Sequence, residues 1–147
     1  YFENKQALFR DCVDHVMERL IKAVDDPDDR GSVEGFGRAI ENFLRYFDEN
    51  PAYIELLIQE RAVFKDRTTP TYLEYCGRHK DEHKQYFENL IAQGVFRPLP
   101  VERLFDIISD LLYGTIFTNY FAKREPCLEQ QAADITDLLL NGLLTRR

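Results

Sequence analysis

Apolar residues recur at helical spacing along almost the whole chain, and this pattern restricts the possible folds more than any other feature. Between Asn4 and Val24, for example, the apolar side chains fall three or four residues apart and define one face of a helix. No alternating apolar and polar run bounded by turn residues is present, so no strand is expected. The pattern predicts an all-α fold, and the length of 147 residues fits one domain.

Helix-breaking residues divide the chain into six predicted helices. Asn50 and Pro51 are typical of an N-cap followed by proline at the first helical position, and Gly94 is a typical helix end. Pro100 opens the fifth predicted helix, and Pro126 precedes the sixth. The six predicted helices span residues 4–24, 33–49, 51–66, 70–93, 100–123 and 126–145.

Net charge, cysteine spacing and hydropathy limit the environments and partners that we expect for this chain. The chain has 19 basic and 26 acidic residues and a net charge of -7, so we expect it to bind duplex DNA poorly by itself. Cys12, Cys76 and Cys127 form no CxxC pair, which favours reduced thiols in a cytoplasmic protein. The most apolar stretch, residues 104–121, contains two aspartates, so no membrane span is expected.

Polar residues on the apolar face of the predicted fourth helix are the main candidates for a site. Cys76, His79 and His83 follow one another at helical spacing among aromatic residues, and Glu60 has similar apolar neighbours on the preceding helix. Buried polar groups need partners. These four side chains could satisfy one another or the backbone, orient a ligand in a cavity, or bind a transition metal.

We expect a mainly apolar pocket enclosed by the first five predicted helices, with the fourth as one wall. Aromatic residues make up 13% of the chain and would provide bulky walls around few polar groups. Such a pocket suits a flat or elongated small organic effector, oriented by hydrogen bonds from the histidines. The expected ligand-binding residues are Phe43, Glu60, Phe64, Tyr72, Cys76, His79, His83, Phe87, Tyr113 and Phe117.

The last two predicted helices are apolar on more than one face, which predicts a homodimer. A terminal helix of a small domain ordinarily buries one face, and a second apolar face favours packing against a copy of the same helix. We expect an interface of roughly 2,000 Å² or more, with close backbone approach at its glycines. The expected interface residues are Leu112, Gly114, Ile116, Leu128, Ile135, Leu139, Gly142 and Leu143.

No catalytic motif is found in the sequence. A GxSxG nucleophile elbow, a phosphate-binding glycine loop and an HExxH zinc motif are all absent. The run from His79 to His83 has the spacing of two zinc-binding histidines, but its acidic residues are in the wrong positions for HExxH. We therefore expect neither an enzyme nor a cofactor.

Three short motifs resemble the TetR family of transcriptional regulators. The residues from Tyr1 to Phe9 read YFENKQALF, which is similar to the aromatic-Phe-x-x-Lys-x-x-Leu signature that closes the family's helix-turn-helix head. Residues 94–98, GVFRP, resemble the turn between the family's seventh and eighth helices. Residues 111–115, LLYGT, resemble the small-residue segment of its eighth helix.

The resemblance implies a domain organisation and a function. Residues 1–5 would be the remnant of the DNA-binding head, in which Tyr1 and Lys5 contact backbone phosphates, and residues 6–147 would form a six-helix effector-binding and dimerisation domain. The last two helices of each chain would form a four-helix bundle. The whole protein would be a ligand-responsive repressor, or less often an activator, that reaches operator DNA only through the head missing from this chain.

Two alternatives stay open beside this interpretation. The first is a small helical metal-binding protein or enzyme that uses Glu60, Cys76, His79 and His83, although the paired Glu-x-x-His motifs of a di-iron bundle are absent. The second is a purely structural dimer without a ligand. Tight metal binding would favour the first, and a core without a pocket would favour the second.

Overall fold

The computed structural model describes residues 3–29, 31–66 and 68–145, and helices joined by turns and loops are the regular secondary structure over these ranges, with no strand. The all-α prediction is therefore confirmed. The described elements are α1 (Lys5–Val24), the 3₁₀ turn η1 (Pro27–Asp29), α2 (Val33–Glu49), α3 (Pro51–Val63), α4 (Thr71–Arg78), α5 (Lys80–Ala92), α6 (Val101–Phe121) and α7 (Leu128–Asn141). None of these helices is long and apolar enough to cross a membrane.

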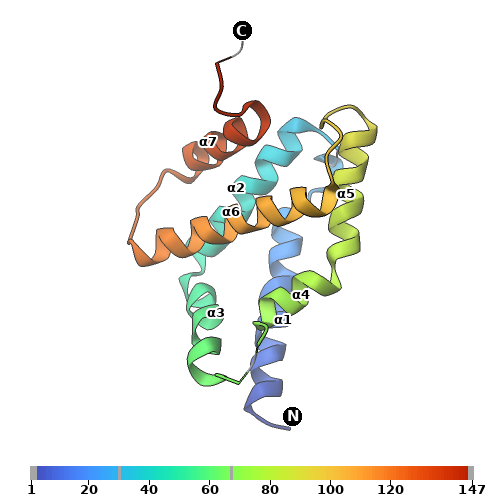
Figure 1. The fold of residues 1–147 in the computed structure, drawn as a ribbon. Coiled ribbons are helices and arrows are strands. Elements are labelled where there is room, and N and C mark those ends of the chain that lie inside the picture. Colours follow the sequence, from blue (N-terminus) through green and yellow to red (C-terminus); the bar gives the residue numbers. More distant parts are fainter. Residues whose placement is uncertain (1–2, 30, 67, 146–147) are drawn as a thin grey trace.

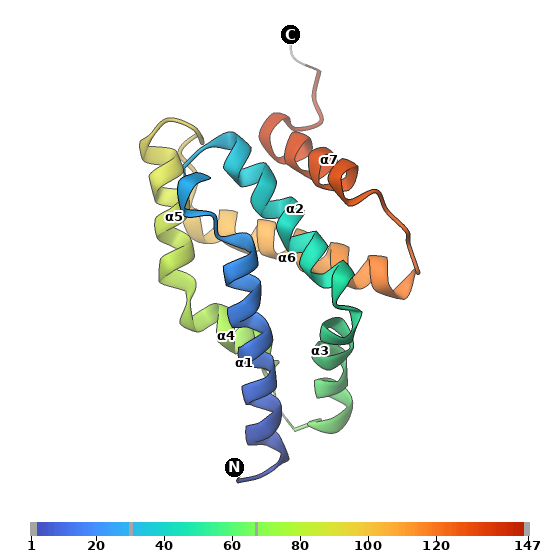
Figure 2. The same ribbon diagram turned by 180° about the vertical axis from the view of Figure 1, so that it is seen from behind.

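The central element is α2, which packs against α1, α6 and α7 (Figures 1 and 2). Its apolar side chains lie on one face, and Ile40, Leu44 and Phe47 are among the most deeply buried residues of the chain. Burial of such side chains is the main source of stability for a helical domain. The helix α4 packs against α1, and α5 packs against α6.

Three of the predicted helix boundaries lie where the sequence signals place them. The Asn4 side chain accepts a hydrogen bond from the backbone N–H of Ala7 at 2.9 Å, so the predicted N-cap of the first helix is confirmed. Pro51 occupies the first turn of α3, directly after Asn50, as predicted. Gly94 has a φ of +73° just after α5, where a left-handed conformation commonly ends a helix.

The prediction of one continuous helix over residues 70–93 is wrong, because the helix breaks at His79 into α4 and α5. The backbone of His79 has φ -104° and ψ 11°, outside the helical region. Gly77, a poor helix former, lies two residues before the break. Packing also directs the two pieces differently, since Arg78 on α4 pairs with Asp14 on α1 at 2.7 Å.

Two of the other helices end earlier than predicted. The third helix ends at Val63 rather than near residue 66, and the last ends at Asn141 rather than near residue 145. Gly142 follows with a φ of +72°, a conformation that favours glycine and stops the helix. The last helix, α7, packs along α2, and side-chain hydrogen bonds between Asn119 and Gln131 join it to α6.

Candidate ligand pocket

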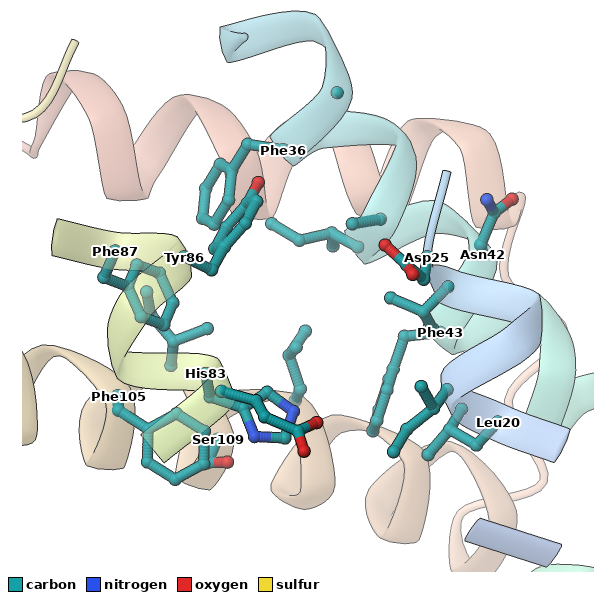
Figure 3. Close-up of a pocket in the computed structure, with 18 of the residues that line it drawn as sticks. Leu20, Asp25, Phe36, Asn42, Phe43, His83, Tyr86, Phe87, Phe105 and Ser109 are labelled. Carbon is teal, nitrogen blue, oxygen red and sulfur yellow. The ribbon is translucent and has the colours of Figure 1, made fainter. Parts of the chain in front are cut away.

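A cavity of about 530 Å³ lies between α1, α2, α4, α5 and α6. Its volume falls within the range of small-molecule sites in proteins. Figure 3 shows Phe36, Tyr86, Phe87 and Phe105 along one side of the cavity, and Phe43 on the opposite side. Because α3 contributes no described lining residue, the predicted enclosure by the first five helices is corrected to the helices named here.

Aromatic rings form most of the rigid surface of the cavity. Phe43 makes an edge-to-face contact with Tyr113, with ring centroids 5.4 Å apart. Across the cavity, the imidazole of His83 lies against the ring of Phe105 at 5.1 Å. These contacts orient the rings around the cavity, and aromatic walls of this kind suit a planar or bulky apolar ligand.

A thiol and a phenol form a polar pair on the cavity wall. The Cys76 sulfur lies 3.7 Å from the Tyr113 hydroxyl oxygen, and both groups line the cavity. Burial raises the pKa of the Cys76 thiol, and it raises the pKa of the Tyr113 hydroxyl well above its ordinary value. Both groups are therefore neutral at physiological pH and can donate or accept hydrogen bonds from a ligand.

His83 lines the cavity, and its two ring nitrogens differ in hydrogen bonding. Its Nδ1 lies 2.8 Å from the backbone carbonyl oxygen of His79. A carbonyl oxygen can only accept, so Nδ1 carries the hydrogen and donates it. In the neutral ring Nε2 is then the acceptor, and a ligand that binds there would donate a hydrogen bond.

The rim of the cavity is acidic. Asp25, Asp26, Asp29 and Glu82 line it, and the guanidinium of Arg38 forms an ion pair with Asp29. Figure 3 shows Asp25 at the end of α1, facing the wall formed by Tyr86 and its neighbours. The pKa of the Tyr86 hydroxyl is raised, first by burial and then by the Asp25 carboxylate.

Five of the ten predicted ligand-binding residues line this cavity, and five do not. The cavity brings together Phe43, Cys76, His83, Phe87 and Tyr113. Whether they bind a ligand stays a prediction. The structure places Glu60, Phe64, Tyr72, His79 and Phe117 outside the lining, which corrects the expectation that all ten share one pocket.

The break at His79 explains much of this difference. The His79 ring packs on Tyr75 with centroids 4.4 Å apart, and its Nδ1 lies 3.5 Å from a Glu82 oxygen. Tyr72 belongs to α4 and stacks behind Tyr113, at 5.1 Å, rather than facing the cavity. One straight helix would have placed Tyr72 and His79 on the same face as His83. After the break, Cys76 of α4 still lines the cavity with His83, whereas Tyr72 and His79 do not.

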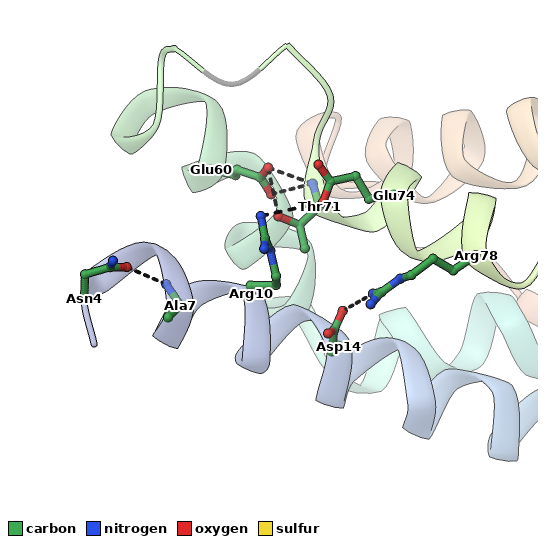
Figure 4. Close-up of polar contacts among 8 residues, drawn as sticks. All are labelled: Asn4, Ala7, Arg10, Asp14, Glu60, Thr71, Glu74 and Arg78. Carbon is green, nitrogen blue, oxygen red and sulfur yellow. Dashed lines mark hydrogen bonds and ion pairs between the residues drawn. The ribbon is translucent and has the colours of Figure 1, made fainter. Parts of the chain in front are cut away.

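Glu60 has a structural role that its position in the sequence does not reveal. Its carboxylate accepts hydrogen bonds from the backbone N–H of Thr71 at 2.7 and 3.0 Å and from the Thr71 hydroxyl at 3.1 Å (Figure 4). Thr71 is the first residue of α4. At a helix N-terminus a carboxylate accepts hydrogen bonds from the free N–H groups and interacts favourably with the helix dipole. Phe64 packs elsewhere, against Phe9 at 5.3 Å.

The alternative metal site is not assembled. Among residues 3–29, 31–66 and 68–145, no three His, Cys, Asp or Glu side chains lie close enough to hold a metal ion. Glu60 is engaged with Thr71, while His83 lines the cavity and His79 does not. These four side chains therefore do not form one cluster.

Several cavity residues were not predicted from the sequence. Phe36, Phe105, Asp25 and Tyr86 line the cavity. Phe36 and Phe105 carry the apolar pattern of any core residue, so that pattern could not separate them from the core. The run of aspartates that begins at Asp25 was the available signal for an acidic rim.

The predicted dimer residues have diverse environments. Ile116 and Ile135 are buried in their own chain, with exposed fractions of 2% and 9%, so they are corrected from interface to core. Leu112 lines the cavity, and Leu128 and Leu139 are half-buried against the core. The exposed members of the predicted interface are Gly114, Gly142 and Leu143.

A different stripe of α6 is exposed and apolar. Ile107, Leu111, Gly114 and Phe121 recur at intervals of four, three and seven residues, which places them on one face of the helix. The exposed fractions of Ile107 and Phe121 are 61% and 65%. Outside the neighbouring backbone of its own helix, a Cβ atom at Gly114 would meet no described atom within 4 Å. No described part of the chain therefore covers this face.

The predicted phosphate contacts can be placed only in part. Tyr1 lies outside the described residues. Lys5 begins α1 and is exposed, at the end of the helix farthest from the cavity.

No protein-family model, curated protein or solved structure matches this chain. The resemblance to the TetR family consequently rests on the three sequence motifs.

Proposed function

We propose that this chain is the effector-binding and dimerisation part of a TetR-type transcriptional regulator. The observation that carries the proposal is the aromatic-walled cavity beside α1. The second half of α1 contributes cavity residues from Met17 to Val24, and its first residue is Lys5, within the motif YFENKQALF. A ligand in the cavity would thus contact the same rigid helix whose other end carries the signature of a DNA-binding head.

This arrangement provides a mechanism for ligand control. An effector that fills the cavity would favour one position of α1 relative to α2 and α6, and so one spacing of the two heads in a dimer. It can shift that balance only by its difference in affinity for the two arrangements. Repression would follow if the unliganded spacing fits two successive major grooves, about one helical turn apart.

The exposed face of α6 supports the dimer in this proposal. Ile107 and Phe121 lie seven residues on either side of Gly114, or about 10 Å along the helix axis. In an antiparallel pair of α6 helices that cross at Gly114, Ile107 of one chain would meet Phe121 of the other. Such self-complementarity is what a two-fold interface requires, and the exposed Leu138, Leu143 and Leu144 would extend the apolar area.

The sequence encoded immediately upstream of Tyr1 tests the proposal. We expect three short helices there, a basic helix-turn-helix among them, since a DNA-binding head needs clustered Lys and Arg. A gene that starts at this chain, or an upstream segment without such a head, would overturn the proposal.

The metal-binding alternative is not supported by any specific observation in the described residues, since its four side chains are separated. We do not propose it as a second function.

A further inference from the structure

The lining of the cavity has a strong excess of negative charge. Four carboxylates contribute to it, from Asp25, Asp26, Asp29 and Glu82, against one guanidinium, that of Arg38. That guanidinium already forms an ion pair with Asp29. The described lining therefore holds no further cationic side chain that could neutralise a carboxylate, phosphate or sulfate group of a ligand.

The aromatic interior of the cavity also favours a positively charged ligand, for a reason independent of the acidic rim. Phe36, Phe43, Tyr86, Phe87 and Phe105 surround the space with aromatic rings (Figure 3). The faces of such rings carry partial negative charge and attract cations, with greater effect where water is excluded. In its neutral form His83 adds an acceptor nitrogen, which would pair with an N–H or O–H of the ligand.

We infer that this cavity binds an amphipathic organic cation. The apolar body of the ligand would lie among the aromatic rings, and its positive charge would face the acidic rim near Asp25. The inference rests on the proposed function and deepens it by giving the chemical class of the effector. It disfavours fatty acids, acyl thioesters of polyanionic carriers and phosphorylated metabolites. These would bring negative charge to an acidic rim, where like charges repel.

Two ions of nearly identical shape and opposite charge test the inference. Tetraphenylphosphonium and tetraphenylborate each present four phenyl rings around a charged centre, so their difference in affinity reports the charge preference of the cavity. We expect calorimetric titration in low-salt sodium buffer to give at least about tenfold tighter binding of the phosphonium. Equal affinities, or tighter binding of the borate, would overturn the inference.

Substitution at the rim separates a local effect from the overall negative charge of the chain. Asp25→Asn removes one charge at the cavity and should weaken phosphonium binding roughly three- to tenfold. Asp28→Asn removes the same charge from the same loop, but Asp28 does not line the cavity, so affinity should change by less than about twofold. Equal losses in the two variants would mean that the net charge of -7, and not the rim, attracts the cation.

A third variant locates the bound ion. Ala39 lines the cavity from α2, and Ala39→Leu adds apolar volume there without changing charge. We expect weaker phosphonium binding while the circular dichroism spectrum stays helical. Unchanged affinity would place the ion elsewhere and overturn the inference.

These titrations can fail independently of the experiments that test the proposed function. If neither ion binds, the cationic class is wrong, whereas the regulatory function is judged by the upstream sequence and by DNA selection. If both ions bind equally within the cavity, an effector pocket remains but its charge preference does not.

Discussion

The Glu60 carboxylate binds the first residue of a helix eleven positions further along the chain. It accepts hydrogen bonds from both the backbone N–H and the hydroxyl of Thr71, and both side chains are buried, with exposed fractions of 1% and 0%. The interaction joins α3 to α4 (Figure 4). It also assigns a buried carboxylate a structural role that sequence patterns alone left open.

Replacing Glu60 should destabilise the fold. Glu60→Ala leaves the buried donors of Thr71 without this acceptor, which we expect to lower the free energy of unfolding by about 2–4 kcal/mol. Urea denaturation provides the measurement, with exposed Glu88→Ala as the matched control at less than about 0.5 kcal/mol. A loss no larger than that of the control would contradict the assigned role.

His83 and His79 should differ in their effect on ligand binding. His83 lines the cavity, whereas His79 packs on Tyr75 outside it. We expect His83→Ala to change the affinity for tetraphenylphosphonium by at least about threefold, or about 0.7 kcal/mol, and His79→Ala to change it less. Calorimetric titration of both variants tests this, and thermal stability should be indifferent to a chelator. A larger effect of His79→Ala would contradict the geometry of the site.

Stability should fall in alkaline solution because the fold buries neutral phenols. The Tyr46 hydroxyl donates to the Val16 carbonyl oxygen at 2.7 Å, and burial, with the neighbouring Tyr53, raises the pKa of Tyr46 to about 12. The unfolded chain releases this proton near pH 10, so the stabilising contribution is complete below pH 10 and is lost as pH rises from 10 to 12. Each such group can contribute a slope of up to about 1.4 kcal/mol per pH unit.

Urea denaturation between pH 8 and 11 measures this slope. Tyr46→Phe should be less stable at pH 8 by about 1–2 kcal/mol, because it loses the hydrogen bond to Val16. Its stability should nevertheless decline less steeply with pH than that of the unsubstituted chain. Identical slopes would show that Tyr46 ionises equally in the folded and unfolded states.

Substitutions on the exposed face of α6 should separate the proposed dimer. Ile107→Glu places a charge in the proposed contact, where burial would be costly, and should yield folded monomers. Leu73→Glu is the matched control, since Leu73 is also exposed but lies on α4. Sedimentation equilibrium should give a dimer for the control. Dimers of Ile107→Glu would exclude this face as the interface.

Gly114 provides an independent test of the same contact. A Cβ atom there would meet no described atom outside the backbone of its own helix turn, and the position is exposed, so Gly114→Phe should leave the monomer folded. A large side chain at the crossing point of two helices should nevertheless weaken dimerisation at least about tenfold. An unchanged dissociation constant would place the crossing elsewhere.

Local signals in the sequence predicted most of the fold. The N-cap at Asn4, the proline at the start of α3 and the glycine after α5 each act within a few residues, so they could be interpreted without a structure. The break at His79 could not be predicted in this way. Its apolar spacing continues through the break, and the direction of each piece depends on distant partners such as Asp14.

The candidate site was predictable to the extent that it follows one helical face. Phe43, His83, Phe87 and Tyr113 were identified because they lie on the apolar sides of their helices. Helical periodicity cannot distinguish an apolar residue beside a cavity from one in a filled core, which is why Phe36 and Phe105 were missed. The use of Glu60 at the start of α4 depended on a tertiary contact between two helices.

Selection of DNA by the complete gene product tests the regulatory function most directly. The protein that includes the residues encoded upstream of Tyr1 should enrich a palindromic site from a random duplex library, with half-sites about one helical turn apart. Residues 1–147 alone, with a net charge of -7, should enrich none at physiological salt. Failure of the complete protein to enrich any sequence, or equal enrichment by residues 1–147, would contradict a TetR-type regulator.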